Sequence, residues 1–316
     1  MRALAQTSLL PEDRPATTAA AAYNDAGDGY LAYADGDPRQ LYAFDSQYAY
    51  GDRRVWSVLD ARLTALRATG AQSVTLLDVG CGPGTWLRRL VIRARALGFS
   101  EIHARGFDVA DAQIRRARHL ARGLQGLAGV DLAFDVGDAT RPLPEADASV
   151  DIALCLYCVL NHLDETGAQR ALGEIARVTR GVFVTTVRAI GSTPTIYVDA
   201  MEHARQFHQD HAAGRLSVEL DDGRRMTFSA RLFAAAGLRS LVNMHFHVDD
   251  LRGLDLFHTR FAHDPRWNPG SVVDSGPFRD ELARLEEKYG ADPEFMDHAT
   301  HLLLVGAARA PRNGPH

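Results

Sequence analysis

The sequence predicts an α/β fold built on a mostly parallel sheet, and three observations support this prediction. Five short apolar runs recur in the first two thirds of the chain. Segments with helical periodicity separate them, and strands that alternate with helices form a parallel sheet covered on both faces. The first run ends in an acid and three closely spaced glycines, which is typical of a strand that turns directly into a helix. The five predicted strands are residues 74–79, 102–107, 130–134, 152–156 and 182–187.

The last third of the chain interrupts this alternation. Two extended segments flank Asp222 and Gly223, a combination that predicts a hairpin. Ser229 is expected to cap the short helix that follows. The elements predicted in this part are the hairpin over residues 216–228, the helix RLFAAAG, a strand over residues 238–246, a helix over residues 277–289 and a final strand over residues 302–307.

The N-terminal region precedes the predicted sheet. Residues 1–22 are rich in Ala, Thr and Pro and are expected to form a loose tail. Asp52 is predicted to cap a helix whose apolar side chains share one face until Gly70 ends it. No internal repeat or low-complexity linker divides the chain, so we expect one domain with an N-terminal extension.

Composition and charge narrow the class of protein. Hydrophobic residues make up 46% of the 316 residues, which is enough for a large buried core. The net charge of -5 at pH 7 gives no general attraction for nucleic acid or anionic membranes. No stretch resembles a membrane span or a secretion signal, and three cysteines are too few for a disulfide framework. We therefore expect a cytoplasmic protein that acts on a small molecule, without nucleic-acid or membrane partners.

The glycines after the first strand give the strongest functional signal. The segment LLDVGCGPGTW places glycine at every second position, at Gly80, Gly82 and Gly84, and Asp78 precedes them. Such glycines let the backbone approach a ligand, and the following helix offers unpaired N–H groups and its positive dipole end. A nucleotide-like ligand is therefore predicted. Because the dinucleotide fingerprint is spaced G-x-G-x-x-G, a nicotinamide dehydrogenase is disfavoured.

Two further acids extend this pattern. Asp108 closes the second predicted strand, where a carboxylate can accept both ribose hydroxyls, and Asp138 follows the third. Together with the glycine turn they resemble the motifs of the class I S-adenosylmethionine (SAM) dependent methyltransferases. The resemblance implies SAM as the ligand and a Rossmann-like, seven-stranded sheet whose last strand is antiparallel. The cofactor-binding residues that it implies are Asp78, Gly80, Cys81, Gly82, Gly84, Asp108, Val109, Asp138 and Ala139. The Asp78 carboxylate is also expected to accept hydrogen bonds from N–H groups of the glycine turn.

The resemblance further implies a division of the chain. Residues 1–70 would form the tail and aromatic lid helices, and residues 71–310 the SAM-binding domain, with insertions at 188–228 and 247–300. Six of the nine tyrosines lie before the predicted sheet, and aromatic faces stabilise a sulfonium cation. We expect Tyr48 and Tyr50 to contact the cofactor. The alternative is that these rings only pack N-terminal helices onto the sheet.

The segment after the fourth predicted strand lies where class I enzymes face the sulfur. Tyr157, Asn161 and His162 are therefore the candidate catalytic residues: Asn161 offers a carbonyl to a nucleophile, and His162 could accept its proton or be structural. No acids follow the fifth strand, so no metal site is expected. The C-x-x-C pair within the fourth strand is expected to be packed core. Candidate substrate contacts are Tyr197 and His203, in the first insertion, and His245 and His247, at the end of the predicted sixth strand.

These observations favour a SAM-dependent methyltransferase that acts on a small molecule, plausibly in bacterial secondary metabolism. A motif associated with methylation of exocyclic nitrogens, Asn-Pro-Pro followed by Tyr or Phe, is absent from the sequence. One alternative keeps the fold but changes the reaction: the amino nitrogen of SAM attacks its own γ-carbon and yields azetidine-2-carboxylate and methylthioadenosine. A second alternative is a non-catalytic protein that binds SAM.

Overall fold

The computed structural model describes residues 19–25, 41, 43–44, 49–192, 204–220, 223, 225–258 and 276–309. A seven-stranded sheet forms the centre of the fold, in the order β3-β2-β1-β4-β5-β10-β9. Its strands are β1 (Ser73–Val79), β2 (Glu101–Asp108), β3 (Val130–Val136), β4 (Val150–Cys155), β5 (Thr179–Arg188), β9 (Phe246–Leu254) and β10 (His301–Ala308). Strands β1 to β5 are parallel, and β10 is antiparallel to both of its neighbours. The predicted class, with an antiparallel last strand, is confirmed.

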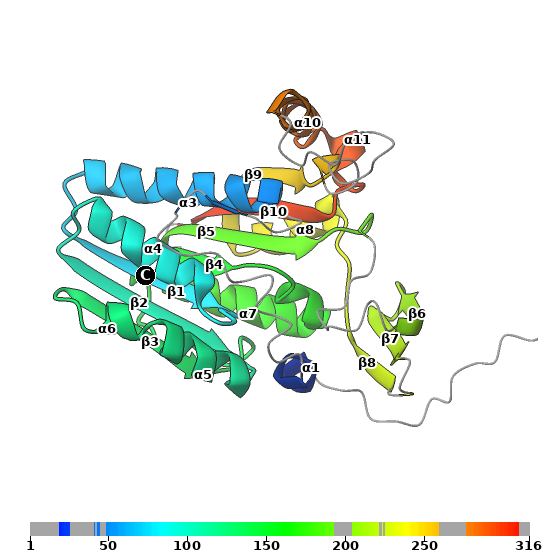
Figure 1. Cartoon of the computed structure of the whole chain (residues 1–316), viewed down its shortest axis with the longest axis horizontal. Coiled ribbons are helices and arrows are strands. Elements are labelled where there is room, and N and C mark those ends of the chain that lie inside the picture. The colour runs from blue at the N-terminus through cyan, green and yellow to red at the C-terminus, as the bar shows by residue number, and fades with distance from the viewer. Residues whose placement is uncertain are drawn as a thin grey trace, which may run out of the picture.

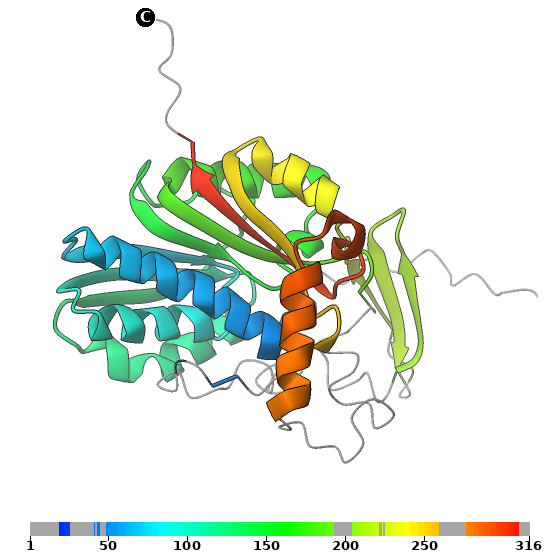
Figure 2. The same cartoon turned by 90° about the horizontal axis from the view of Figure 1, so that it is seen from above.

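Helices cover both faces of this sheet, as Figure 2 shows from above. One apolar core joins it to α3 (Ala49–Ala68), α4 (Thr85–Ala96) and α5 (Asp111–Leu120). A second core joins its other face to α7 (Glu165–Val178) and α8 (Ala235–Asn243). Strand β10 shows why both faces are apolar, because Leu303 packs into the first core while Leu302 and Leu304 pack into the second. This alternation is the period of two expected of a strand buried on both sides.

The N-terminal helices differ from the prediction in where they begin. Helix α3 starts at Ala49, so Asp52 lies in its first turn and not at its cap. The Asp52 carboxylate accepts a hydrogen bond from the Tyr157 hydroxyl, a partner that local sequence does not reveal. Gly70 follows the helix with a φ of 90°, in agreement with the predicted stop. The alanine-rich segment predicted as part of a loose tail forms α1 (Ala19–Asp25), since alanine has the highest helix propensity.

The strand predicted over residues 238–246 is wrong. Residues 235–243 form α8, because Leu238, Leu241 and Val242 recur at helical spacing and are buried on the second core. The strand comes afterwards, as β9, and the helix predicted directly after Ser229 is correspondingly displaced. Residues 247–254 therefore belong to the sheet and not to the predicted second insertion. Because β9 and β5 are both antiparallel to β10, they run in the same direction.

The insertions add small elements at one end of the sheet. The predicted hairpin is confirmed as β7 (Arg215–Leu220) and β8 (Arg225–Ser229), joined by β6 (Ala204–Asp210) in a separate sheet. Between β9 and β10 lie α10 (Gly276–Tyr289) and α11 (Pro293–Met296), the first of which was predicted. The small sheet and α1 lie beyond the carboxyl ends of the parallel strands (Figure 1). Within the described ranges, no helix is long and apolar enough to cross a membrane.

Candidate active site

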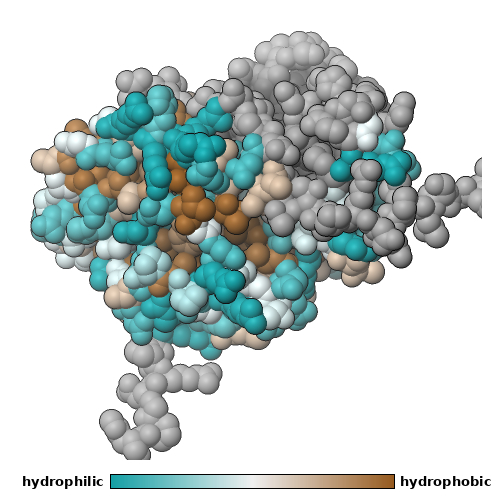
Figure 3. Space-filling model, turned by 90° about the horizontal axis from the view of Figure 1, so that it is seen from below, coloured by the Kyte–Doolittle hydropathy of each residue, from teal (hydrophilic) through white to brown (hydrophobic). Residues whose placement is uncertain are grey.

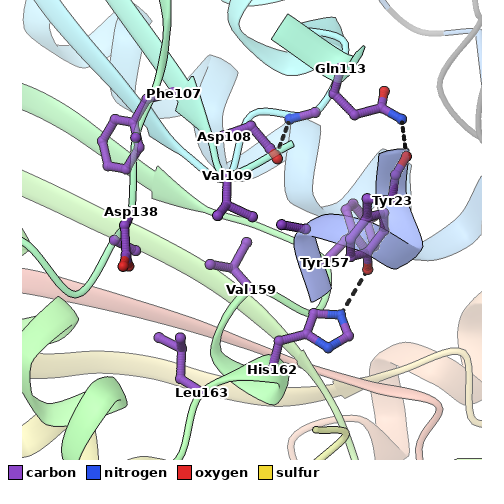
Figure 4. Close-up of a pocket in the computed structure, with 15 residues that line it drawn as sticks. Tyr23, Phe107, Asp108, Val109, Gln113, Asp138, Tyr157, Val159, His162 and Leu163 are labelled. Atoms are coloured by element: carbon purple, nitrogen blue, oxygen red, sulfur yellow. Dashed lines mark hydrogen bonds between the residues drawn. The ribbon is translucent and has the colours of Figure 1, made fainter. Parts of the chain in front are cut away.

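A cavity of about 370 Å³ opens at the carboxyl ends of β1 to β4. This is the edge at which parallel α/β sheets bind their ligands. Helix α1 borders it through Ala20 and Tyr23, the second of which is labelled in Figure 4. Its lining comprises Ala20, Tyr23, Gly80, Gly82, Phe107, Asp108, Val109, Gln113, Gly137, Asp138, Ala139, Tyr157, Val159, His162 and Leu163. The structure thus brings together eight of the predicted site residues: Gly80, Gly82, Asp108, Val109, Asp138, Ala139, Tyr157 and His162.

The glycine turn is fixed by hydrogen bonds to the second strand. The N–H groups of Gly80 and Cys81 donate to the Phe107 carbonyl at 2.8 and 3.0 Å. Gly80, Gly82 and Gly84 all have positive φ angles, of 74°, 50° and 75°, a backbone conformation that only glycine adopts without strain. Gly84 is the N-cap of α4, so the turn leads directly into that helix.

Replacing Gly80 with alanine is expected to reduce the free energy of unfolding by about 2 kcal/mol, since a left-handed φ and a crowded methyl group both oppose it. The new Cβ would lie 2.2 Å from Cγ2 of Val159, a side chain that lines the cavity. Denaturant unfolding measures the loss. The control is Gly123→Ala, where the Cβ would meet nothing within 4 Å. Adding Val159→Ala should restore part of the stability, and no restoration would show that the contact is not the cause.

Asp108 holds the mouth of the cavity through its carboxylate. One oxygen accepts the N–H of Gly82 at 3.0 Å and the other accepts the N–H of Ala110 at 2.8 Å. Burial is the largest influence on this group and raises its pKa, while the backbone hydrogen bonds oppose that rise. On the next strand, the exposed Asp138 carboxylate accepts the N–H and hydroxyl of Thr140. Two carboxylates therefore face the cavity from neighbouring strands.

Apolar side chains form the remaining rim of the cavity. Val109, directly after β2, is 44% exposed, although large apolar residues usually lie inside. Figure 3 shows hydrophobic residues gathered on the described surface between hydrophilic ones, seen from below. Val109 lines the cavity together with Phe107 and Leu163. An apolar rim beside two carboxylates matches a nucleoside, whose base has flat apolar faces and whose ribose donates hydrogen bonds.

Asp78 and Cys81 lie behind the cavity and do not line it. Asp78 is 2% exposed, and its burial, together with the charge of Asp108, raises its pKa to about 7. The expectation that it accepts N–H groups of the glycine turn is wrong, because those of Gly80 and Cys81 donate to Phe107 and that of Gly82 to Asp108. Burial raises the pKa of the Cys81 thiol as well. Gly84 also lies outside the cavity lining.

Tyr157 occupies a strained position between the cavity and the N-terminus of α3. Its φ is 48° and that of Cys158 is 73°, which non-glycine residues adopt only when their surroundings hold them. The N–H of Tyr157 donates to Oγ1 of Thr186 at 2.8 Å, and its hydroxyl donates to Asp52. Burial and the Asp52 charge keep its pKa well above the usual value, so the phenol stays protonated.

A row of aromatic rings extends from Tyr157 to the N-terminal region. The ring centroids of Tyr157 and Trp86 are 6.1 Å apart, and Phe44 stacks on Trp86 at 5.9 Å. Tyr50 is not part of this row. Its hydroxyl donates to Glu287 at 3.0 Å and its ring stacks on His258, away from the cavity lining. Tyr48, Tyr197 and His203 lie outside the described residues.

Asn161 has a structural role and does not face the cavity, in contrast to the prediction. Its side-chain amide donates to the carbonyls of Arg188 and Arg231 at 3.3 and 2.5 Å and accepts the N–H of Arg188 at 3.0 Å. The side chain is 2% exposed. It thereby joins the end of β5 to the segment after β8, and its carbonyl is not available to a nucleophile.

Asn161→Ala is expected to lower the free energy of unfolding by about 2 to 3 kcal/mol, because it leaves buried backbone groups without their partner. The affinity of the folded protein for a cavity ligand should stay the same. Thermal unfolding and calorimetry measure the two quantities. The control is Asn243→Ala, which removes one exposed contact with Arg309. A loss of affinity without a loss of stability would restore Asn161 as a cavity residue.

Both ring nitrogens of His162 form hydrogen bonds. Its Nδ1 lies 2.8 Å from the Ser229 carbonyl, which can only accept, so Nδ1 carries the proton. Its Nε2 lies 2.8 Å from the hydroxyl of Tyr23, as the dashed line in Figure 4 marks. Burial lowers the pKa of His162, and the ring is therefore neutral at neutral pH.

Sequence reasoning missed the individual roles of Tyr23 and Gln113. Both line the cavity, and the Gln113 side chain donates to the Tyr23 carbonyl at 3.3 Å. Tyr23 belonged to a recognised tyrosine cluster, but its partner is 139 residues away and no local signal selects it. The proposed substrate contacts His245 and His247 are wrong, because they lie at the amino end of β9, opposite the cavity edge.

Metal-binding groups do not gather at this site. Among the residues that the structure describes, no three His, Cys, Asp or Glu side chains are placed to hold an ion. Cys155 and Cys158 are buried and form no disulfide bond, and burial raises the pKa of Cys155.

Comparison with known proteins identifies the domain. Residues 76–181 match the model of a family described as a methyltransferase domain. These residues form a methyltransferase domain. They include the glycine turn, Asp108, Asp138 and the segment from Tyr157 to His162, and so contribute most of the cavity lining. The methyltransferase domain makes the chain an enzyme that uses SAM.

Solved structures that are similar over most of the chain were also found. A SAM-dependent methyltransferase from Methanosarcina mazei is 17% identical with a TM-score of 0.49, over 77% of this chain and 96% of that one. The CcbJ methyltransferase from Streptomyces caelestis is 15% identical with a TM-score of 0.47, over 80% and 89%. The 4+2 cyclase SpnF is 20% identical with a TM-score of 0.48, over 94% and 98%. A search of proteins with curated functions gave no match.

Proposed function

We propose that the enzyme transfers the methyl group of SAM to a small molecule, in a route of secondary metabolism. The observation that supports this most is the cavity itself, which carboxylates, an apolar rim and a Tyr–His pair line together. Its volume of about 370 Å³ falls within the range of small-molecule sites. The net charge of -5 supports a small acceptor over a nucleic acid.

The residues around the cavity fit SAM. Asp108 would accept the ribose hydroxyls, Asp138 would lie near the adenine amino group, and Val109 and Leu163 would contact the adenine ring. The aromatic face of Tyr157 would border the sulfonium and stabilise its charge by cation–π attraction. SAM supplies a methyl carbon that is electrophilic because it is bound to a positively charged sulfur.

The enzyme's own contribution would be to align an acceptor in line with this carbon and to exclude water. Helix α1 supports this proposal because it lies over the cavity and is tied to the sheet domain. Asn24 accepts the N–H of Ala112 at 3.0 Å, and Gln113 donates to the Tyr23 carbonyl. We propose that α1 is the described part of the lid implied by the tyrosine-rich N-terminal segment.

The test is to incubate the purified protein with SAM, first alone and then with a panel of small hydroxyl and amine acceptors. Mass spectrometry identifies every sulfur-containing product. We expect S-adenosylhomocysteine to form only when an acceptor is present. Methylthioadenosine and azetidine-2-carboxylate from SAM alone would contradict methyl transfer and indicate the intramolecular cyclisation instead.

A control separates weak activity from contamination. The Asp108→Ala variant should lose turnover with every acceptor, since the proposal places its carboxylate on the ribose. Binding of SAM by calorimetry, with no product under any condition, would overturn the proposal in favour of a non-catalytic binding protein.

A further inference from the structure

Tyr23 and His162 form a hydrogen-bonded pair inside the cavity. Both residues line it, and the Tyr23 hydroxyl is 2.8 Å from Nε2 of His162. The two rings meet edge to face, with centroids 5.4 Å apart and an interplanar angle of 80°. Since Nδ1 of His162 donates to the Ser229 carbonyl, Nε2 is the acceptor and the Tyr23 phenol is the donor.

Each member of this pair is held in place by a different element. His162 belongs to the short helix η2 (Leu160–His162), whose neighbour Asn161 is locked to the backbone of β5. Ser229 is the last residue of β8, so the small sheet fixes the imidazole tautomer. Tyr23 is positioned by the contacts of α1 with Ala112 and Gln113. Three elements from distant parts of the sequence therefore hold the Tyr23–His162 pair.

We propose that Tyr23 is a catalytic residue, whose phenol takes the proton of a phenolic or enolic acceptor hydroxyl as it passes its own proton to His162. This inference rests on the proposed function. His162 acts through Tyr23 and is a positioning residue that also stores the proton. In the same way, enzymes activate a nucleophile with a base that a third group orients; here the Ser229 carbonyl orients His162, which acts on Tyr23.

The step balances in atoms and charge. The acceptor oxygen forms a bond to the methyl carbon, and the bond from that carbon to sulfur breaks, leaving a neutral thioether. The acceptor proton moves to the Tyr23 oxygen, and the Tyr23 proton moves to Nε2 of His162. The positive charge of the sulfonium thus ends on the imidazolium, which the Ser229 carbonyl stabilises and which releases its proton to solvent.

The chemistry of the pair selects the class of acceptor. Proton transfer is most efficient between groups of similar pKa, and a phenol or enol hydroxyl is close to tyrosine in this respect. An aliphatic alcohol is a much weaker acid than tyrosine, so transfer of its proton to the Tyr23 oxygen is unfavourable. Because burial lowers the pKa of His162, the imidazole is in its neutral, proton-accepting form at neutral pH.

The test compares two probe acceptors, phenol and 4-nitrophenol, with benzylamine as an amine probe, and measures release of S-adenosylhomocysteine. The assay is run at pH 8, where the nitro compound is largely ionised and needs no base, whereas phenol remains protonated. We expect Tyr23→Phe to reduce kcat/KM about 100-fold for phenol, the contribution of a general base, but only a few-fold for 4-nitrophenol. His162→Gln should give the same pattern, and affinity for S-adenosylhomocysteine should be unchanged. Tyr289→Phe, which removes a phenol hydroxyl far from the cavity, is the matched control.

The outcomes separate this inference from the proposed function. An equal loss with both phenols, accompanied by weaker binding of S-adenosylhomocysteine, would show that the pair only latches α1 and would overturn the catalytic role. Methylation of benzylamine without either phenol would overturn the acceptor class while leaving methyl transfer in place. Absence of turnover with both phenols would overturn it too. Failure to bind SAM at all would instead contradict the proposed function.

Discussion

Replacing Asp108 with alanine is expected to weaken the affinity for S-adenosylhomocysteine by about 100-fold or more. A carboxylate that accepts two ribose hydroxyls makes two charge-assisted hydrogen bonds, each worth about 1.5 to 3 kcal/mol. The same carboxylate holds the N–H groups of Gly82 and Ala110, so its removal also loosens the glycine turn. Isothermal titration calorimetry measures the change.

Two further variants make this prediction specific. Asp108→Asn keeps one oxygen acceptor and should recover part of the affinity. Asp131→Ala removes a carboxylate that is 77% exposed at the amino end of β3, on the opposite edge of the sheet, and should bind as the wild type does. If Asp108→Ala binds as tightly as Asp131→Ala, the ribose does not lie where we place it.

The first five strands could be predicted from the sequence because β1, β4 and β5 are apolar runs buried on both faces, and the buried positions of β2 and β3 are mostly apolar and alternate with exposed or half-buried ones. Strand β9 could not be predicted in this way. It is an edge strand with the sequence FHVDDLRGL, and its charged side chains form ion pairs with other elements, such as Asp249 with Arg62 and Arg252 with Glu287. Edge strands often carry charges, which conceal the period of two. The preceding segment has a clearer pattern, but its period is helical.

Some residues of the site could likewise be predicted from the sequence, and others could not. The glycine turn and Asp108 could be predicted because the turn needs glycine at its positive φ angles and because the acid stands directly at the end of a strand, so residue type and spacing mark both. The roles of Asn161 and His162 could not be distinguished, because adjacent residues in a turn point to different sides and only the fold shows which side is the cavity. Asn161 faces the backbone of β5, whereas His162 meets Tyr23. Contacts between such distant segments leave no local pattern.

Replacing Asp78 with asparagine is expected to stabilise the folded chain above pH 7 by up to about 4 kcal/mol. Burial and the Asp108 charge raise the pKa of Asp78 from 3.8 to about 7 in the folded state. Each unit of pKa difference corresponds to about 1.4 kcal/mol. Between about pH 4 and pH 7 the unfolded chain has lost this proton while the folded chain keeps it, so wild-type stability falls as pH rises through that window and stays low above it.

Denaturant unfolding between pH 4 and pH 8 tests this directly, because Asp78→Asn should lack the decline across that window. Asp131→Asn, which removes one exposed negative charge, controls for the change in net charge. Parallel pH profiles for the wild type and Asp78→Asn would show that Asp78 does not titrate as its burial indicates.

The charge of Asp78 should also affect how much bound SAM stabilises the folded protein. Ionised Asp78 is unfavourable in the empty protein, whereas the positive charges of SAM in the adjoining cavity would favour it. SAM should therefore raise the melting temperature of the wild type more than that of Asp78→Asn at pH 8, and the difference should shrink at pH 5, where wild-type Asp78 is protonated. If SAM raises the melting temperature of the wild type and of Asp78→Asn equally at both pH values, the charge of Asp78 does not interact with bound SAM.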